Sequence, residues 1–270
     1  LLMKAGGGKF FTDLAMATVG RRRGGAAKVS VVASALFGTV SGTAVSNVVT
    51  TGIITIPLMQ RGGYKATHAG AIEAIASTGG QFMPPIMGAA AFLMAEMLEI
   101  PYAEIVVAAI VPSLLYYFAV FIQVDLIAAR DDIQFVDLEV SRTSDVLRDG
   151  WHFIVPFAVL IYTLFELNLP PQRAAIYSSA SLVIAFFKPY RGERLQISQL
   201  FDVFCNTGRV VIELLMITAT AGFVIGILNL TGLGFALTIA LTSLAGESLI
   251  VLLLISAVIC IVLGMGMPTL

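Results

Sequence analysis

The chain has 270 residues, of which 58% are hydrophobic and 12% are charged. Soluble domains carry about 25% charged residues, so this composition excludes an ordinary soluble domain and predicts an integral membrane protein. The formal net charge of −1 leaves no basic surface for nucleic acid, and two isolated cysteines, Cys205 and Cys260, predict neither a disulfide framework nor a metal site.

The first predicted feature is a helical hairpin over about residues 26–60, which follows a short amphipathic helix at residues 9–19. Its first arm, residues 26–40, is 15 residues long, roughly 22 Å of helix, whereas the hydrocarbon core of a membrane is about 30 Å thick. A polar tip follows at residues 41–47. Non-helical backbone at membrane depth is tolerated only inside protein or beside a wet cavity, so we expect a re-entrant hairpin.

A second interruption divides the apolar stretch at residues 64–98. The run STGGQFMPP at residues 77–85 contains two glycines and two prolines, which are the residues that most often end a helix. The sequence therefore predicts a discontinuous helix here.

Four later stretches approach membrane-spanning length: residues 101–124, 151–167, 171–187 and 210–228, the last with a weaker break at residues 218–222. The polar loops between them, residues 129–150 and 188–208, hold most of the nearby Lys and Arg, so this side is predicted to be cytoplasmic. Counting spans backwards places residues 21–23, Lys28 and residues 61–65 on the same side.

The end of the chain repeats the beginning. A shift of 226 positions lays Gly6, Gly8, Thr12 and Gly20 onto Gly232, Gly234, Thr238 and Gly246, and a short helix at residues 235–245 precedes an apolar arm at 249–263 and a break at 264–269. Span parity makes the second copy inverted, as is typical of secondary transporters. We therefore expect an all-α membrane protein with three parts: residues 1–100 as the first repeat and transport domain, 101–209 as connecting scaffold helices, and 210–270 as the start of the second repeat.

The hairpin tips offer groups that bind ions. Helix N-termini favour anions, while unwound carbonyls and the oxygens of Ser41, Thr43, Ser46, Asn47 and Thr269 suit Na⁺. The alternative is that these small residues only let helices pack closely.

Three runs resemble the large membrane subunit of tripartite ATP-independent periplasmic (TRAP) transporters. ALFGTVSGTAVSNVVTTG at residues 35–52, followed by IPLM at 56–59, resembles the first hairpin of that family; GGQFMPPIMGAAAF at 79–92 resembles its broken helix, and GMGMPT at 264–269 its second hairpin. The motifs are closest to the branch with fused membrane subunits and a TAXI-type receptor.

The resemblance implies an elevator-type Na⁺ symporter in the inner membrane of a bacterium or archaeon, with no covalent cofactor. It implies three partners: a periplasmic TAXI-type binding protein that delivers a small organic anion, a small membrane subunit fused in the full-length chain, and the lipid bilayer. It assigns Na⁺ sites to Ser41, Asn47, Thr78, Gly264 and Thr269, and substrate contacts to Gly42, Thr43, Ala44, Ser46, Gly80, Gln81 and Pro84.

The chain is expected to be an internal part of a longer protein, because it begins at Leu1 within apolar sequence and stops after a Gly-rich break. We expect this part alone not to transport. The main alternative is a receptor-independent symporter for Na⁺ and divalent anions. A channel is a further alternative, whereas the absence of HExxH and GxSxG motifs disfavours a membrane enzyme.

Four further polar residues lie in or near the apolar segments. Glu73 is expected within an apolar segment, either as a hydrogen-bonded structural acid or as part of ion coupling. Glu213 is expected to pair with Arg209 at the i, i+4 spacing of a helix. His68 and His152 are expected to have no metal or catalytic role.

Overall fold

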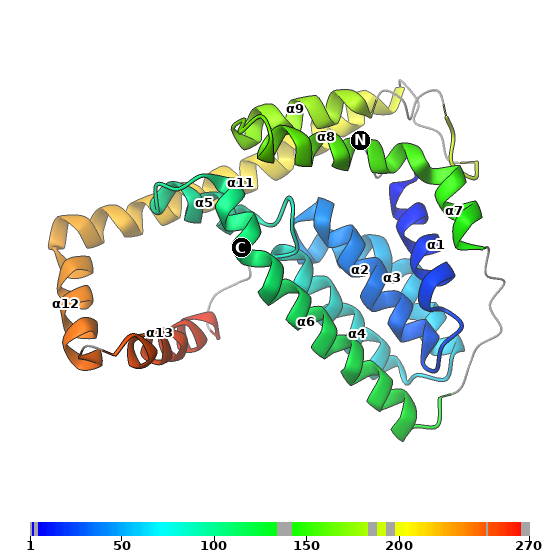
Figure 1. Cartoon of the computed structure of the whole chain (residues 1–270), viewed down its shortest axis with the longest axis horizontal. Coiled ribbons are helices and arrows are strands. Elements are labelled where there is room, and N and C mark those ends of the chain that lie inside the picture. The colour runs from blue at the N-terminus through cyan, green and yellow to red at the C-terminus, as the bar shows by residue number, and fades with distance from the viewer. Residues whose placement is uncertain are drawn as a thin grey trace. The chain divides into compact units, whose positions relative to one another are not determined.

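The computed structural model describes residues 2, 5–133, 142–182, 188–192, 198–246 and 248–265, and the regular elements among them are all helices (Figure 1). The chain divides into two units, Leu1–Phe201 and Asp202–Leu270. Each unit is described by itself.

The first unit begins with α1 (Gly7–Val19) and the two arms of a helical hairpin, α2 (Gly25–Ser41) and α3 (Ala44–Arg61). The turn between the arms consists of Gly42, in the left-handed region at φ 61°, and Thr43, which is extended. The predicted arms and turn are therefore present, but the tip is shorter than expected because residues 44–47 already belong to α3. That the hairpin enters a membrane and returns stays a prediction.

The predicted discontinuous helix is α4 (Ala66–Thr78), a 3₁₀ turn η1 (Gly79–Gln81), and α5 (Ala89–Met97). Residues 82–88 between η1 and α5 are not helical. We call residues 79–88 the break. It coincides with the glycine- and proline-containing run that the sequence singled out.

A long helix, α6 (Tyr102–Arg130), packs against the hairpin and α4 (Figure 1). Its buried Tyr117, Val124 and Ala128 join Val31 of α2 and Ile72 of α4 in one apolar cluster. The helix extends six residues beyond the expected end of the span, and so includes Asp125 and Arg130. The proposed division of the chain at residues 100 and 209 stays a prediction.

The remainder of the first unit consists of α7 (Thr143–Gly150), a 3₁₀ turn η2 (Trp151–Phe153), α8 (Ile154–Phe165) and α9 (Pro171–Ser181). α8 and α9 pack together, and α7 packs on α1. A second apolar cluster around Phe10 of α1, Phe153 and Tyr190 holds this region. The expected loop at residues 129–150 is helical at both of its described ends, and residues 183–187 of the expected third span lie outside the described residues.

The second unit contains α12 (Leu233–Ala245) and α13 (Leu249–Gly264), which follow α11 (Ser198–Thr231). The predicted break at residues 218–222 is wrong, since α11 runs through it. The hydroxyl of Thr220 donates to the Met216 carbonyl at 2.9 Å, within the helix, and one interior glycine costs only about 1 kcal/mol. The predicted loop at 188–208 is likewise helical from Ser198 onwards.

The repeat predicted from the glycines is visible in the helix bounds. α1 and α12 each have 13 residues, and both of their ends differ by the same 226-residue offset. Each helix is preceded by a left-handed glycine, Gly6 at φ 96° and Gly232 at φ 69°. The inverted orientation of the two copies stays a prediction.

Within the described residues, α6 is long and apolar enough to cross a membrane by itself. The last part of α11 (Thr218–Thr231) meets the same criterion only together with α12, and the two are bent by 74°. α2 and most of α13 are shorter apolar helices. α8 and α9, with 12 and 11 residues, are shorter than the spans expected at their positions.

Candidate functional site

The hairpin tip touches the break through backbone atoms. A Cβ atom on Gly42 would lie 2.1 Å from the Met87 carbonyl oxygen, and one on Gly38 would lie 2.4 Å from Cα of Gly80. Real Cβ atoms do not approach other atoms so closely, so both positions need glycine. The hairpin and the break, which are separate in the sequence, therefore meet at one patch of close backbone contacts.

Asn47 joins the three helices that meet at this patch. Its side chain is fully buried, and Nδ2 donates to the carbonyl oxygens of Ser34 at 2.9 Å and Ser77 at 3.5 Å. A Cβ atom on Gly80 would lie 2.9 Å from the same Nδ2. Asn47 therefore fixes the first turn of α3 against α2 and the end of α4.

Several predicted site residues meet here. Ser41, Gly42 and Thr43 form the tip, with the Ser41 hydroxyl 3.5 Å from the Thr43 carbonyl oxygen, and Asn47 follows in the first turn of α3. Gly80 and Gln81 lie on the facing break, where the Gln81 carbonyl accepts from the Gly88 N–H at 2.6 Å. Their roles in binding stay predictions.

The other predicted site residues are placed differently. The Thr78 hydroxyl donates to Ala74 of its own helix at 2.8 Å, and the Ser46 side chain is exposed. Ala44 and Pro84 are half-buried, at the tip and within the break. Gly264 ends α13 in the second unit, and Thr269 lies outside the described residues.

Sequence reasoning missed most of a polar network directly behind Asn47. The fully buried carboxyl group of Glu73 accepts hydrogen bonds from five hydroxyl groups on three helices. Ser30 and Ser34 belong to α2, Thr51 and Thr55 to α3, and Ser77 to α4; the five oxygen–oxygen distances range from 2.5 to 3.4 Å. The expectation that Glu73 is hydrogen-bonded is confirmed.

A sequence signal for this network exists. Ser30 and Ser34, Asn47, Thr51 and Thr55, and Glu73 and Ser77 each recur at a spacing of four, which places them on one face of their helix. Three polar stripes on otherwise apolar helices indicate that the stripes face one another.

The sequence model of the family described as "Tripartite ATP-independent periplasmic transporter, DctM component" matches residues 1–270. The chain belongs to this DctM family. The family is a component of tripartite transporters.

Curated relatives agree. The chain is 28% identical over 211 residues to the C4-dicarboxylate TRAP transporter large permease protein DctM of Pseudomonas aeruginosa, covering 77% of this chain and 48% of that protein. It is 26% identical to protein YgiK of Salmonella typhimurium (76% and 47% covered) and 24% identical to protein y4mL of Sinorhizobium fredii (81% and 52% covered). The chain thus spans about half the length of the relatives it matches.

An ion pair ties the hairpin of this DctM-family chain to α6. Nζ of Lys28 lies 2.5 Å from Oδ1 of Asp125, and Arg23 binds the other carboxylate oxygen. The Lys28 side chain is only 7% exposed. Asp125 was missed because it lies one residue past the expected end of the span.

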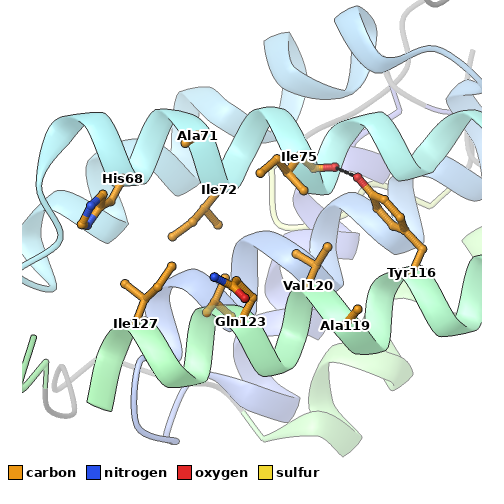
Figure 2. A pocket seen from close by; sticks show the side chains of 10 residues that line it. His68, Ala71, Ile72, Ile75, Tyr116, Ala119, Val120, Gln123 and Ile127 are labelled. Atoms are coloured by element: carbon orange, nitrogen blue, oxygen red, sulfur yellow. Dashed lines mark hydrogen bonds between the residues drawn. The ribbon is translucent and has the colours of Figure 1, made fainter. Parts of the chain in front are cut away.

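A cavity of about 350 Å³ lies between α4 and α6 (Figure 2). Its lining is apolar except for His68, Gln123 and Tyr116, whose hydroxyl donates to the Ile75 carbonyl at 2.8 Å. At the end near His68, Nδ1 of that residue lies 3.5 Å from Asp131, which was not expected from sequence. None of the predicted site residues lines this cavity, so it is separate from the hairpin tip.

Charged groups at the α3–α4 turn and after α6 influence one another. A hydrogen bond from Arg130 is the main cause that lowers the pKa of Asp131. Burial raises the pKa of Tyr64 to about 12, with the negative charges of Asp125 and Asp131 adding to the effect.

Glu213, predicted to pair with Arg209, has a side chain outside the described part of the chain.

Proposed function

We propose that the full-length protein is the permease of a Na⁺-coupled TRAP transporter, which imports small carboxylates handed over by a periplasmic binding protein. The observation that supports this most directly is the contact between the hairpin tip and the break, where Gly42, Gly80 and Asn47 bring unwound backbone and a buried amide together. Substrate and ion sites of secondary transporters lie at such helix interruptions.

The proposed substrate is an organic dicarboxylate or a related acid. The Pseudomonas aeruginosa relative is named for C4-dicarboxylates. Thr43 precedes the first turn of α3 without capping it through its side chain, so the N–H groups of that turn are available to an anion. We assign substrate contacts to Gly42, Thr43, Ala44, Ser46, Gly80, Gln81 and Pro84.

The proposed coupling ion is Na⁺, and no covalent cofactor is involved. Oxygen atoms of Ser41, Asn47 and Thr78 in the first repeat, and of Gly264 and Thr269 in the second, would be its ligands. Support comes from the chemistry of these groups, because hydroxyl, amide and carbonyl oxygens are hard neutral ligands. An elevator movement of the hairpin unit past a scaffold would carry both ions and substrate.

The proposed partners are a periplasmic receptor, of the TAXI type, and a small membrane subunit fused to this one in the full-length chain. Family membership supports a receptor and a small subunit in general. The TAXI type of receptor and the fusion of the subunits are inferred from the sequences of the motifs alone. The proposed location is the inner membrane of a bacterium or archaeon.

Uptake of radiolabelled dicarboxylates into proteoliposomes tests the proposal. The full-length protein is reconstituted with and without its receptor, under an inward Na⁺ gradient or an equal K⁺ gradient. Accumulation that requires both Na⁺ and receptor is the expected result. Accumulation with Na⁺ and no receptor would instead establish the receptor-independent symporter, and equilibration without accumulation would establish a channel.

A further inference from the structure

Glu73 is a buried acid with no counter-charge in the part of the chain that the structure describes. No described residue forms an ion pair with it, although a buried ionised carboxylate costs several kilocalories per mole unless it is neutralised. Lys28, the buried cation on α2, is already bound to Asp125 of α6, and the Tyr117 hydroxyl of α6 donates to the Ala76 carbonyl. The other titratable groups on α3, α4 and α6 (Arg61, His68, Tyr102, Glu104, Tyr116 and Arg130) have no hydrogen bond to Glu73 among the described residues.

The network satisfies the ionised form of Glu73. Oε2 accepts from Ser30 at 2.6 Å and Thr55 at 2.5 Å, and Oε1 accepts from Thr51 at 2.5 Å and Ser77 at 3.1 Å. These four bonds fill the roughly four acceptor positions of a carboxylate. The fifth hydroxyl, that of Ser34, has Thr51 Oγ1 as an alternative partner at 3.3 Å.

The same heavy-atom positions also satisfy the protonated form. A proton on Oε1 is donated to Thr51 Oγ1, which then turns its own hydrogen towards Asn47. Two acceptors lie there, the Asn47 carbonyl oxygen at 2.8 Å and its side-chain Oδ1 at 3.3 Å. A proton on Oε2 instead turns Thr55 towards the Thr51 carbonyl at 3.0 Å, which leads away from the hairpin tip.

We infer that Glu73 is a proton-binding site, and that its protonation changes the hydrogen bonding of Asn47 next to the hairpin tip through the hydroxyl of Thr51. Glu73 and Asn47 share no hydrogen bond in the described structure, and Thr51 lies between them. When Glu73 is ionised, Thr51 donates to it and Asn47 Oδ1 is free to accept a cation. When Glu73 is protonated, Thr51 donates to the Asn47 carbonyl oxygen or to Asn47 Oδ1. The bond to Oδ1 competes with a cation for that oxygen, so H⁺ and Na⁺ oppose each other.

The proton site itself is tested without any transport assay. Infrared difference spectra of the purified full-length protein are recorded across the pH range in which it stays folded, for the wild type and Glu73→Gln. A carboxylic-acid C=O band that disappears as pH rises, and that Glu73→Gln lacks, is expected. Glu104→Gln, on an exposed position of α6, is the matched control and keeps the band. A band that does not titrate, or none that depends on Glu73, overturns the inference.

The link to Asn47 rests on the proposed Na⁺ site and has its own test. Thermal stabilisation of the full-length protein by NaCl against choline chloride gives an apparent Na⁺ affinity, measured on both sides of the infrared midpoint. We expect the apparent Na⁺ affinity to be about 3- to 10-fold weaker when Glu73 is protonated, because one competing hydrogen bond to the ligand oxygen has an effect of that size. Glu73→Gln should show the weak value at every pH.

Two threonines of α3 make a matched pair for this test. Thr51→Val and Thr55→Val each remove one hydroxyl from Glu73 at nearly constant shape, but only Thr51 connects to Asn47. Thr51→Val should abolish the pH dependence of Na⁺ affinity and Thr55→Val should keep it; the reverse result overturns the connection. Absence of Na⁺ stabilisation at every pH would contradict the proposed Na⁺ site, while the infrared result would still decide the proton site.

Discussion

Lys28 of the hairpin and Asp125 of α6 are 97 positions apart in the chain, yet Nζ and Oδ1 are separated by 2.5 Å. The lysine is almost wholly buried, whereas the Asp125 side chain is 28% exposed and also binds Arg23. The pair is therefore asymmetric, and removing the lysine charge should change the stability of the protein differently from removing the aspartate charge.

Asp125→Asn should destabilise the protein by about 3–5 kcal/mol, because it leaves the Lys28 charge buried and unpaired. Lys28→Met should cost less, since Asp125 keeps Arg23 and methionine fills the space of the lysine stem. Thermal unfolding of both variants in detergent checks this order. Equal losses would mean that the Lys28 charge is not buried in the protein as purified.

Gly38→Ala should separate the hairpin from the break. The added methyl group would lie 2.4 Å from Cα of Gly80, and overpacking of this kind costs about 1–3 kcal/mol. Gly70→Ala in α4 is the matched control, because nothing lies within 4 Å of its added Cβ. It should stabilise the helix by about 0.5–1 kcal/mol, so opposite shifts of melting temperature are expected for the two variants.

Asn47→Ala should destabilise the hairpin tip by about 1–3 kcal/mol, since the Ser34 and Ser77 carbonyl groups lose a buried donor. Ser46→Ala, the adjacent and exposed substitution, should stay within about 0.5 kcal/mol. Both are measured by thermal unfolding without added Na⁺, so that the structural effect is separated from any ion binding. Similar effects at both positions would contradict the hydrogen bonds assigned to Asn47.

Tyr64 should make the protein less stable in alkali. Its hydroxyl is buried without a hydrogen-bond partner among the described residues, and burial raises its pKa to about 12, against about 10 in an unfolded chain. The folded state therefore holds the proton longer than the unfolded state does. Its stability contribution is complete below about pH 10 and is lost as pH rises towards 12.

Tyr64→Phe tests this directly. The variant should be as stable as the wild type or more stable at neutral pH, because it removes an unsatisfied hydroxyl, and its melting temperature should fall less between pH 9 and pH 11. Tyr117→Phe is the control, since it removes a hydroxyl that donates to the Ala76 carbonyl at 3.0 Å and should lose about 1 kcal/mol. A parallel alkaline decline in the wild type and Tyr64→Phe would contradict the assignment.

Local sequence was sufficient for the hairpin arms and for the break, because glycine at position 42 and the glycines and prolines at 79–85 act on the backbone of their own segment. It was misleading in α11, where threonine hydroxyls bond within the helix and a single glycine is tolerated. Polar residues in an apolar stretch do not by themselves distinguish these two outcomes.

The contacts behind the tip needed tertiary structure. Which cation pairs with Asp125, and which hydroxyls surround Glu73, depends on how α2, α3, α4 and α6 pack, and no single segment specifies that. The helical spacing of Ser30 with Ser34 and of Thr51 with Thr55 narrows the choice to one face of each helix. It does not name the partner.

The contact of Gly42 with Met87 and of Gly38 with Gly80 involves no side chain that could change its rotamer. Such an interface cannot loosen gradually as longer side chains reorient; it is either closed or parted by a shift of the main chain. Any opening of the hairpin tip should therefore be a single concerted step, with an activation barrier set by backbone displacement and insensitive to the size of side chains elsewhere on the tip.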